Sequence, residues 1–323
     1  MTGVEFRTNA ALSAFILSEA EALLASGSLI ARDVLPVTAV PRRAGQIWYQ
    51  TLDVLRIEDD SRTPGTIGPI GHGEGAWMDY PTLKQHSFAA EVYDEEVEEA
   101  GDQGIPINLQ QDRASFALRK VLFAREKRLV DLIALDASFY AGTGGIVTTP
   151  AAKRWDNPNL PESNPLKDID DMLSVLPFDP SHIIIPSWVQ KKIAGHWCFV
   201  DLQKQFRSDL LTDGGLPPVI RKMKVLSPGQ TIISNSKGIA DAFAQLYLDD
   251  IVMFYQGGTT PGTNSVWGWG RTLTYKTPDP LVTETWRQDP EGRNFYRTRD
   301  KGSREFIISR HCAGVIRDTC SAT

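Results

Sequence analysis

Three short clusters in the sequence contain residue types that can do chemistry. His196-Trp197-Cys198 and His311-Cys312 each place an imidazole beside a thiol, and zinc prefers these ligands. Asp249-Asp250 places two carboxyl groups side by side, as in an acid–base dyad. Neither histidine–cysteine pair has a second pair at the spacing of a zinc site, and adjacent residues of a strand point to opposite faces. We therefore predict buried histidines beside core cysteines and no acid–base dyad.

Two glycine-rich segments are further candidates. Thr63–Gly75 contains five glycines, two prolines and His72, but no lysine, serine or cysteine. Gly142–Gly145 follows a predicted helix instead of opening one. A phosphate-binding loop opens a helix and usually carries lysine followed by serine or threonine. The pattern thus argues against phosphate binding and favours a structural extension over Thr63–Gly75, with an enzyme lid near His72 as the alternative.

The rest of the sequence contains no G-x-S-x-G, H-E-x-x-H or Walker motif, so we predict no catalytic residue, no cofactor and no metal ion. Cys198, Cys312 and Cys320 form no C-x-x-C pair and are odd in number, which predicts free thiols in a reducing cytosol. The net charge of −6 argues against a sequence-specific DNA-binding protein. We expect no membrane span and no signal peptide, because apolar runs are short and Glu19 and Glu21 follow the N-terminal one.

The elements begin with an N-terminal arm over residues 1–45. A helix is predicted at about Ala10–Ala25, followed by an extended connector over Leu29–Arg43 that contains two prolines. Strand-like segments over Gln46–Arg56 and Ala76–Leu83 enclose the glycine-rich segment. Two strands around such a segment predict a β-hairpin that projects from the body over residues 46–83.

A strand and a long helix come next. The strand, over His86–Val97, becomes acidic, and the run Glu91–Asp102 holds seven carboxylates and no basic residue. Its spacing is not that of a calcium loop, so we interpret it as a solvated or interface-facing acidic face. The helix is predicted over Leu109–Tyr140 with Asn108 as its N-cap. At 1.5 Å per residue it would span roughly 45–50 Å and act as a strut.

The first part of this helix is basic. Two acidic residues, Asp112 and Glu126, accompany six basic ones in residues 109–128. The basic residues are Arg113, Arg119, Lys120, Arg125, Lys127 and Arg128. Two interpretations stay open, because these side chains can pair with the preceding acidic strand or can form a mildly basic surface that touches packaged nucleic acid.

The remaining sequence alternates helices and strands without a repeated βαβ unit, which predicts an α+β fold. Helices are predicted over 166–176, from 188 and over 238–246, and strands over 181–186, 219–225, 231–234, 251–255, 267–276, 281–287 and 304–317.

The order of these elements resembles that of the major capsid proteins of tailed bacteriophages, whose fold is shared with encapsulin shells. Local sequence is similar at Trp155-Asp156 and Ser163–Ile169, at His182–Pro186 with Trp188 and Ile193, at Thr277–Pro280 with Val282–Trp286, and at Ala313–Asp318. The resemblance extends over nearly the whole chain and rests on the ordered combination of elements.

The resemblance implies an α+β tailed-phage major capsid fold with an N-terminal arm (1–45), an extended β-hairpin loop (46–83), a peripheral domain (84–165 and 277–323) containing the spine helix 109–140, and an axial domain (166–276). It implies a non-enzymatic structural protein that self-assembles into the hexamers and pentamers of an icosahedral phage or prophage head around double-stranded DNA. Expected partners are further copies of the chain, a scaffolding protein, a portal, a decoration protein and non-specifically bound DNA. The expected location is the virion, after assembly in the bacterial host cytoplasm.

Two alternatives remain, an encapsulin-like compartment with a cargo enzyme and a soluble hydrolase with a glycine-rich lid. The sequence also departs from some family members in two ways. About 45 residues precede the hairpin, so we expect a separate scaffolding protein instead of a cleaved N-terminal segment. No lysine lies between Gln46 and Leu83, so we expect no isopeptide cross-link from this loop.

Overall fold

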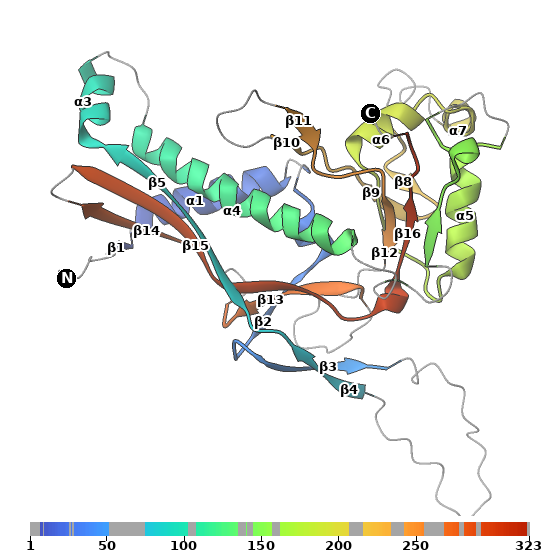
Figure 1. Cartoon of the computed structure of the whole chain (residues 1–323), viewed down its shortest axis with the longest axis horizontal. Coiled ribbons are helices and arrows are strands. Elements are labelled where there is room, and N and C mark those ends of the chain that lie inside the picture. Colours follow the sequence, from blue (N-terminus) through green and yellow to red (C-terminus); the bar gives the residue numbers. More distant parts are fainter. Residues whose placement is uncertain are drawn as a thin grey trace, which may run out of the picture.

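The computed structural model describes residues 7–8, 10–25, 27, 29–51, 75–102, 108–134, 140, 145–156, 162–206, 216–233, 242–254, 268–277, 281–288 and 292–321. These residues form an α+β fold with two six-stranded sheets. Figure 1 shows an elongated part, in which α4 (Leu109–Ile133) lies along the first sheet, and a more compact part around the second sheet. The compact part contains α5 (Pro165–Val175), α6 (Ser187–Ile193) and α7 (Trp197–Phe206). None of the helices described here is both long and apolar enough to cross a membrane.

The first sheet is organised around its longest strand, β15. Its strands are β1 (Arg7–Thr8), β14 (Leu281–Gln288), β15 (Arg293–Ile307), β13 (Gly270–Tyr275), β2 (Val37–Val40) and β5 (Lys84–Tyr93). The first half of β15 pairs with β14 on one edge and β5 on the other, and its second half pairs with β13. Gly302 lies in a bulge of β15, just before the residues of β15 that pair with β13. Its φ of +144° favours glycine. Its N–H donates to the Asp300 carboxylate at 2.9 Å, which holds the bulge.

Helix α4 covers this sheet and begins where the sequence predicts. The Asn108 side chain accepts a hydrogen bond from the Gln111 N–H at 3.2 Å, which confirms the N-cap. The prediction that the helix continues to Tyr140 is wrong, because it ends at Ile133. The Tyr140 hydroxyl donates to the Ile133 carbonyl at 2.7 Å and satisfies one of the last free carbonyls. With 25 residues α4 is about 37 Å long.

The N-terminal segment is part of the subunit core. Helix α1 (Ala10–Ala25) is confirmed, and Leu12 and Ile16 pack against Leu118 and Leu122 of α4. The extended connector predicted over Leu29–Arg43 is wrong in its first half, where the chain forms α2 (Ala31–Val34) and buries Ala31 and Val34 in the core. The following strand, β2, pairs in parallel with β13. The arm is thus tied to its own subunit by burial and by backbone hydrogen bonds.

The predicted projecting hairpin is confirmed by its two strands. Strands β3 (Gly45–Gln50) and β4 (Gly75–Tyr80) pair antiparallel, with Trp48 opposite Trp77. Figure 1 shows the pair leaving the body beside β2. Residues 52–74, which include His72 and nearly all of the glycine-rich segment, lie outside the described residues.

The acidic run is half strand and half helix, so the prediction of a continuous strand to Val97 is wrong. Strand β5 ends at Tyr93, and α3 (Asp94–Asp102) follows. Three carboxylates in the first turn, those of Asp94, Glu95 and Glu96, favour a helix because they lie at the positive end of its dipole. The Asp94 carboxylate also accepts from Asn294 Nδ2 at 2.7 Å, which anchors the start of α3 to β15.

The second sheet has the order β6-β16-β12-β7-β9-β8. The strands are β6 (Ile146–Thr148), β16 (Ala313–Arg317), β12 (Ile251–Phe254), β7 (His182–Ile184), β9 (Met223–Leu226) and β8 (Val219–Ile220). A single strand over Arg304–Arg317 is a wrong prediction, because β15 ends at Ile307 and β16 joins the other sheet beside β12. Val315 and Ile316 are fully buried there, which explains the switch. Strands β6 and β16, from residues predicted to belong to the peripheral domain, therefore lie in the second sheet.

A second projecting hairpin was missed by the sequence analysis. Strand β11 (Phe243–Gln245) pairs antiparallel with β10 (Thr231–Ile233), so the helix predicted over Gly238–Leu246 is wrong for these residues. The local sequence is compatible with either state, and pairing with β10 decides. Figure 1 shows this hairpin standing out between the two parts of the molecule.

Candidate functional site

The His196–Cys198 pair lies in the core of the compact part, next to Ser163. The Ser163 hydroxyl donates to the Arg154 carbonyl at 2.9 Å, so it accepts from His196 Nε2, 3.1 Å away. Nδ1 of the neutral ring is then the acceptor for the Cys198 thiol at 3.1 Å. Burial lowers the pKa of His196 and raises the pKa of Cys198, which favours the uncharged form of both. The pair is a satisfied core contact, as the sequence predicts.

The other histidine–cysteine pair is different. Cys312 is buried just before β16, whereas His311 is only partly buried, so the prediction of a buried histidine does not hold there. Within the described residues, no three or more His, Cys, Asp or Glu side chains lie close enough to hold a metal ion, and the three cysteines are free and buried. The glycine-rich segment 142–145 is described only at Gly145.

Asp249 and Asp250 lie in the turn before β12 and not on a strand, which corrects the sequence-based placement. Burial raises the pKa of Asp250 to about 6, the charges of Asp249 and Asp318 add to the rise, and Arg317 opposes it. Burial also raises the pKa of Asp249, whose backbone carbonyl accepts from the Thr319 hydroxyl at 2.6 Å. This hydrogen bond joins the turn before β12 to the C-terminal segment.

Replacing Asp250 with asparagine is expected to stabilise the protein above pH 6. A carboxyl group whose pKa is raised on folding destabilises the fold when ionised, so the penalty grows from about pH 3.8 to about pH 6 and is constant above. The shift corresponds to at most about 3 kcal/mol. Thermal unfolding between pH 4.5 and 8 should show a gain in Tm that widens with pH. The control, Asp79→Asn, removes an exposed charge of β4 that is not among the charges acting on Asp250, and it should change Tm much less; a gain independent of pH would contradict the prediction.

The basic residues of α4 are mostly paired within the subunit. Arg113 alone reaches the acidic run, at 3.9 Å from Glu96. The other basic residues have different partners. Arg119 pairs with Glu19 of α1 at 3.1 Å, and Arg128 pairs with Glu305 of β15 at 2.9 Å. Lys127 pairs with Asp131 of the same helix at 2.5 Å, and Arg125 donates a hydrogen bond to the Thr272 hydroxyl at 3.1 Å. Pairing with the acidic strand is thus correct for one residue. Because these pairs neutralise most of the helix, α4 does not present a continuous basic stripe.

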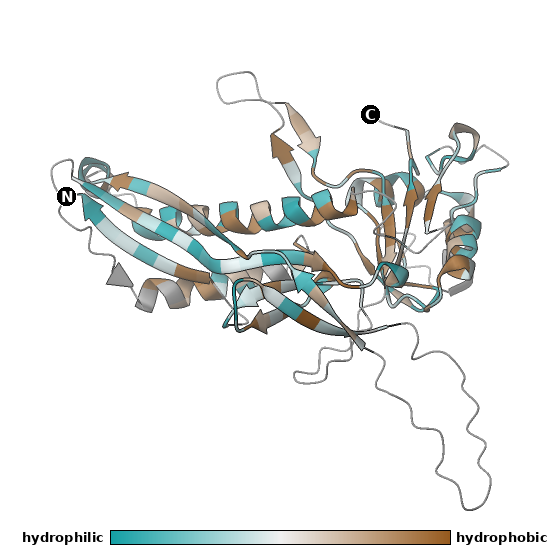
Figure 2. Cartoon of the chain, turned by 60° about the horizontal axis from the view of Figure 1, so that its bottom comes forward, coloured by the Kyte–Doolittle hydropathy of each residue, from teal (hydrophilic) through white to brown (hydrophobic). Residues whose placement is uncertain are grey.

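The two hairpins expose large apolar side chains. Phe243 of β11 is 74% exposed and lies opposite Ile233 of β10, which is 54% exposed. On β4, Trp77 is 66% exposed, whereas the Trp48 ring lies over Gly75, where a Cβ atom would be 2.1 Å from it. Figure 2 shows apolar residues on both hairpins, in contrast to the largely hydrophilic long strands of the first sheet. Exposed apolar surface of this kind marks interaction sites.

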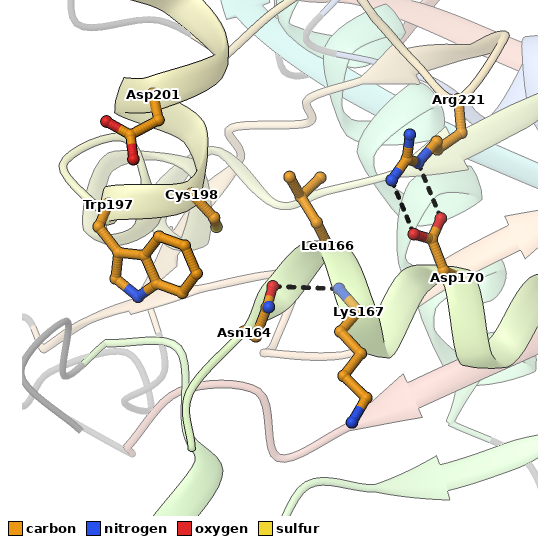
Figure 3. A pocket seen from close by; sticks show the side chains of 8 residues that line it. All are labelled: Asn164, Leu166, Lys167, Asp170, Trp197, Cys198, Asp201 and Arg221. Atoms are coloured by element: carbon orange, nitrogen blue, oxygen red, sulfur yellow. Dashed lines mark hydrogen bonds and ion pairs between the residues drawn. The ribbon is translucent and has the colours of Figure 1, made fainter. Parts of the chain in front are cut away.

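A hollow of about 340 Å³ lies between α5, α7 and the β8–β9 turn (Figure 3). Arg221 makes two hydrogen bonds to the Asp170 carboxylate, at 2.7 and 2.8 Å, and the Asn164 side chain accepts from the Lys167 N–H. Cys198, which also lines the hollow, is engaged with His196. Arg221 and Asp170 therefore neutralise each other, and the lining groups are not arranged as nucleophile, acid and base.

No family model matches the sequence, and no curated protein matches it. Solved structures do match. A phage-related protein of Bordetella bronchiseptica RB50 is 18% identical, with a TM-score of 0.69 over 98% of each chain. Structures from the capsids of cyanophage P-SCSP1u and bacteriophage PhiM1 are each 11% identical and cover 88% of this chain and 86% of theirs, with TM-scores of 0.54 and 0.51. The chain has the tailed-phage major capsid fold.

Within the capsid fold, the segment that carries the sequence resemblance joins α5 to the C-terminal segment. Trp155 is fully buried, and its indole N–H donates to the Asp168 carboxylate at 2.7 Å. Its backbone N–H donates to the Thr319 carbonyl at 2.7 Å. Asn164 caps α5 and Pro165 occupies its first turn. The segment is thus a structural joint of the capsid fold.

Glu126 lies in the core of this fold, whereas the sequence pattern indicated only one of the charges of a helix. Glu126 is 1% exposed, and its carboxylate accepts from the Ala31 N–H at 2.7 Å and from the Tyr247 hydroxyl. It therefore joins α4 to α2 and to the segment between β11 and β12. A signal was present, because Glu126 continues the apolar spacing of Leu118 and Leu122 along one helix face.

Proposed function

We propose that this chain is the structural subunit of an icosahedral phage or prophage head, assembled from hexamers and pentamers around double-stranded DNA. The capsid fold carries the proposal, because phage capsid structures match it along 88% of the chain. The exposed apolar residues of the two hairpins support it, since a single copy leaves Trp77, Ile233 and Phe243 uncovered.

We also propose two domains within the subunit. The first sheet with α4 would form the peripheral domain, and the second sheet, including β6 and β16, would form the axial domain. The β3–β4 hairpin would be the extended loop that lies on a neighbouring copy. A scaffolding protein, a portal and a decoration protein would be the further partners, and the virion would be the location. A structural and non-enzymatic role agrees with the capsid fold.

The test is assembly of the full chain, expressed alone and together with a scaffolding protein from the same genome. Sedimentation velocity and negative-stain electron microscopy should find rings, hexamers or closed shells, and nuclease-resistant DNA should accompany shells filled in the host. Shells that hold a protein cargo and no DNA would favour the encapsulin alternative. A small monodisperse species under both conditions would contradict the proposal and would favour the alternative, a hydrolase with a glycine-rich lid.

A hairpin variant makes this test specific. Ile233→Ser combined with Phe243→Ser is expected to lower the assembled fraction at least tenfold while leaving Tm within about 2 °C, because both side chains are exposed in the isolated subunit. Thr231→Ser, on the same strand, is the matched control and should assemble normally. Normal shells from the double variant would remove the role assigned to this hairpin.

A further inference from the structure

Basic side chains gather where the β3–β4 hairpin leaves the first sheet. They are Arg42, Arg43, Lys84, Lys276, Lys301 and Arg304, which we call the hairpin-base patch. The Arg43 guanidinium and the Lys276 ammonium lie 5.3 and 5.1 Å from the centre of the Tyr275 ring. The segments are joined by hydrogen bonds, from the Leu83 N–H to the Arg43 carbonyl at 2.8 Å and from Arg304 to the Thr82 carbonyl at 3.4 Å. The segments that carry the six cations therefore meet at the base of the hairpin.

Counter-charges lie near only two of these cations, since Asp131 and Glu305 line one hollow together with Lys84 and Arg304. Five of the six side chains are exposed and Arg304 is partly buried. Within the part of the chain that the structure describes, none of them forms an ion pair, whereas Arg119 and Arg128 of α4 each have an acidic partner. Clustered cations repel each other, so an acidic surface that covers the patch would be attracted by the cations that have no acidic neighbour.

The chain itself carries an acidic surface, at the other end of the first sheet. Helix α3 holds six carboxylates and no basic residue, and the side chains of Glu95, Glu96 and Glu98 are exposed. Asp94 and Glu96 pair with Arg287 and Arg113 of the same chain, at 2.8 and 3.9 Å. Glu95 and Glu98 have no such pair among the described residues, so a cationic cover would stabilise α3 mainly through them. Figure 1 shows α3 standing out at the far end of β5.

The two surfaces of one copy cannot meet. Strand β5 ends at Tyr93, opposite Arg293, and α3 starts at the next residue. The patch lies beside Ser303, ten residues further along β15, which corresponds to roughly 33 Å of strand. Any contact between the two surfaces must therefore join different copies.

We propose that the hairpin-base patch is a docking surface for α3 of a second copy of this chain. The inference rests on the proposed function and names one contact between subunits. Because the surfaces occupy different places on the chain, the contact is head-to-tail and can close into a ring. The net charge of −6 makes nucleic acid the less favoured occupant of the patch. Complementary charges at an interface favour one partner over others and fix how the two surfaces align.

A charge exchange tests the contact. The patch variant is Arg42→Glu, Arg43→Glu and Lys276→Glu, the helix variant is Glu95→Lys, Glu96→Lys and Glu98→Lys, and the control is Lys191→Glu, Lys222→Glu and Lys224→Glu in the compact part. The patch and helix variants should each lower the fraction of full-length protein in particles at least tenfold. Their combination should recover to within about threefold of wild type, and the control should stay within twofold. A combination that fails to recover overturns the inference.

Two further results would also overturn it. One is a patch variant that assembles like wild type, and the other is a patch variant whose shells are normal but contain less nuclease-resistant DNA, which would assign the patch to nucleic acid. If circular dichroism shows that a reversed variant is unfolded, the neutral set Arg42→Gln, Arg43→Gln and Lys276→Gln replaces it. This set should lower assembly at least threefold, and no change would overturn the inference.

A readout that does not need shells separates this inference from the proposed function. Full-length chains labelled with ¹⁵N and unlabelled chains are mixed and treated with a zero-length carbodiimide cross-linker. Mass spectrometry should find mixed-isotope peptides that join Lys84, Lys276 or Lys301 to the glutamates of α3. Such cross-links without particles would support the contact and contradict the shell, whereas particles without these cross-links would support the shell and overturn the contact.

Discussion

Replacing Trp155 with alanine is expected to cost about 3–5 kcal/mol of unfolding free energy. The side chain is fully buried in the core of the compact part, where it packs with Ile169 and Met172. Its loss leaves a large cavity and removes the hydrogen bond to the Asp168 carboxylate. Urea unfolding followed by circular dichroism measures the change. Because the cost is comparable to the stability of a typical domain, we expect much of the variant to be insoluble or unfolded at 37 °C.

Two matched variants separate the causes of this loss. Trp155→Phe keeps most of the apolar bulk and removes the indole N–H. The lost hydrogen bond should lower the unfolding free energy by about 1–2 kcal/mol, in addition to the loss caused by the smaller side chain. Trp197→Ala removes a tryptophan from the same part that is 47% exposed, and it should cost less than about 1 kcal/mol. Equal losses for Trp155→Ala and Trp197→Ala would show that burial at Trp155 does not stabilise the joint.

Replacing Glu126 with alanine should destabilise the subunit by about 3 kcal/mol, because it leaves the Ala31 N–H and the Tyr247 hydroxyl buried without an acceptor. Burial raises the pKa of Glu126, and the hydrogen bonds from Tyr247 and Ala31 oppose the rise. Hydrogen exchange should become faster in α2 and at Tyr247, since these segments lose a common anchor. Thermal unfolding measures the change in stability.

A double-mutant cycle shows whether Glu126 acts through Tyr247. Tyr247→Phe removes the donor, and Glu126→Gln keeps the size of the acceptor. We expect a coupling energy of about 1–2 kcal/mol between them, since the two groups are in direct contact. Glu98→Ala, which removes an exposed carboxylate from α3, is the control and should be nearly neutral. Additive losses in the cycle would contradict a direct bond.

Several elements could be predicted from the sequence because local residues decide them. Asn108 and Asn164 were expected before helices, and both side chains accept the backbone hydrogen bonds that start α4 and α5. The β3–β4 hairpin followed from two β-rich segments around a glycine-rich one. Buried runs such as residues 183–185 were expected to be a core strand. In each case the signal lies within a few residues of the element.

Other elements depend on partners that are distant in sequence, and there the predictions were wrong. Helix α4 stops at Ile133 because Tyr140 returns to its last carbonyl. Strand β11 exists because β10 offers it hydrogen bonds, although its residues are also compatible with a helix. Strand β16 leaves the first sheet because Val315 and Ile316 fit the core beside β12. No window of neighbouring residues contains this information.

The histidine and cysteine residues with which the sequence analysis began illustrate the same division. The sequence by itself determined that His196 and Cys198 lack the spacing of a zinc site, since ligand spacing is a local property. It also determined the order of elements that led to the capsid fold. Only the tertiary structure decided that Ser163 completes the hydrogen bonds of His196, that Glu126 joins three segments and that the hairpin-base patch lies far from α3. These properties arise from contacts between segments, and burial and pairing over such separations are set by packing of the whole chain.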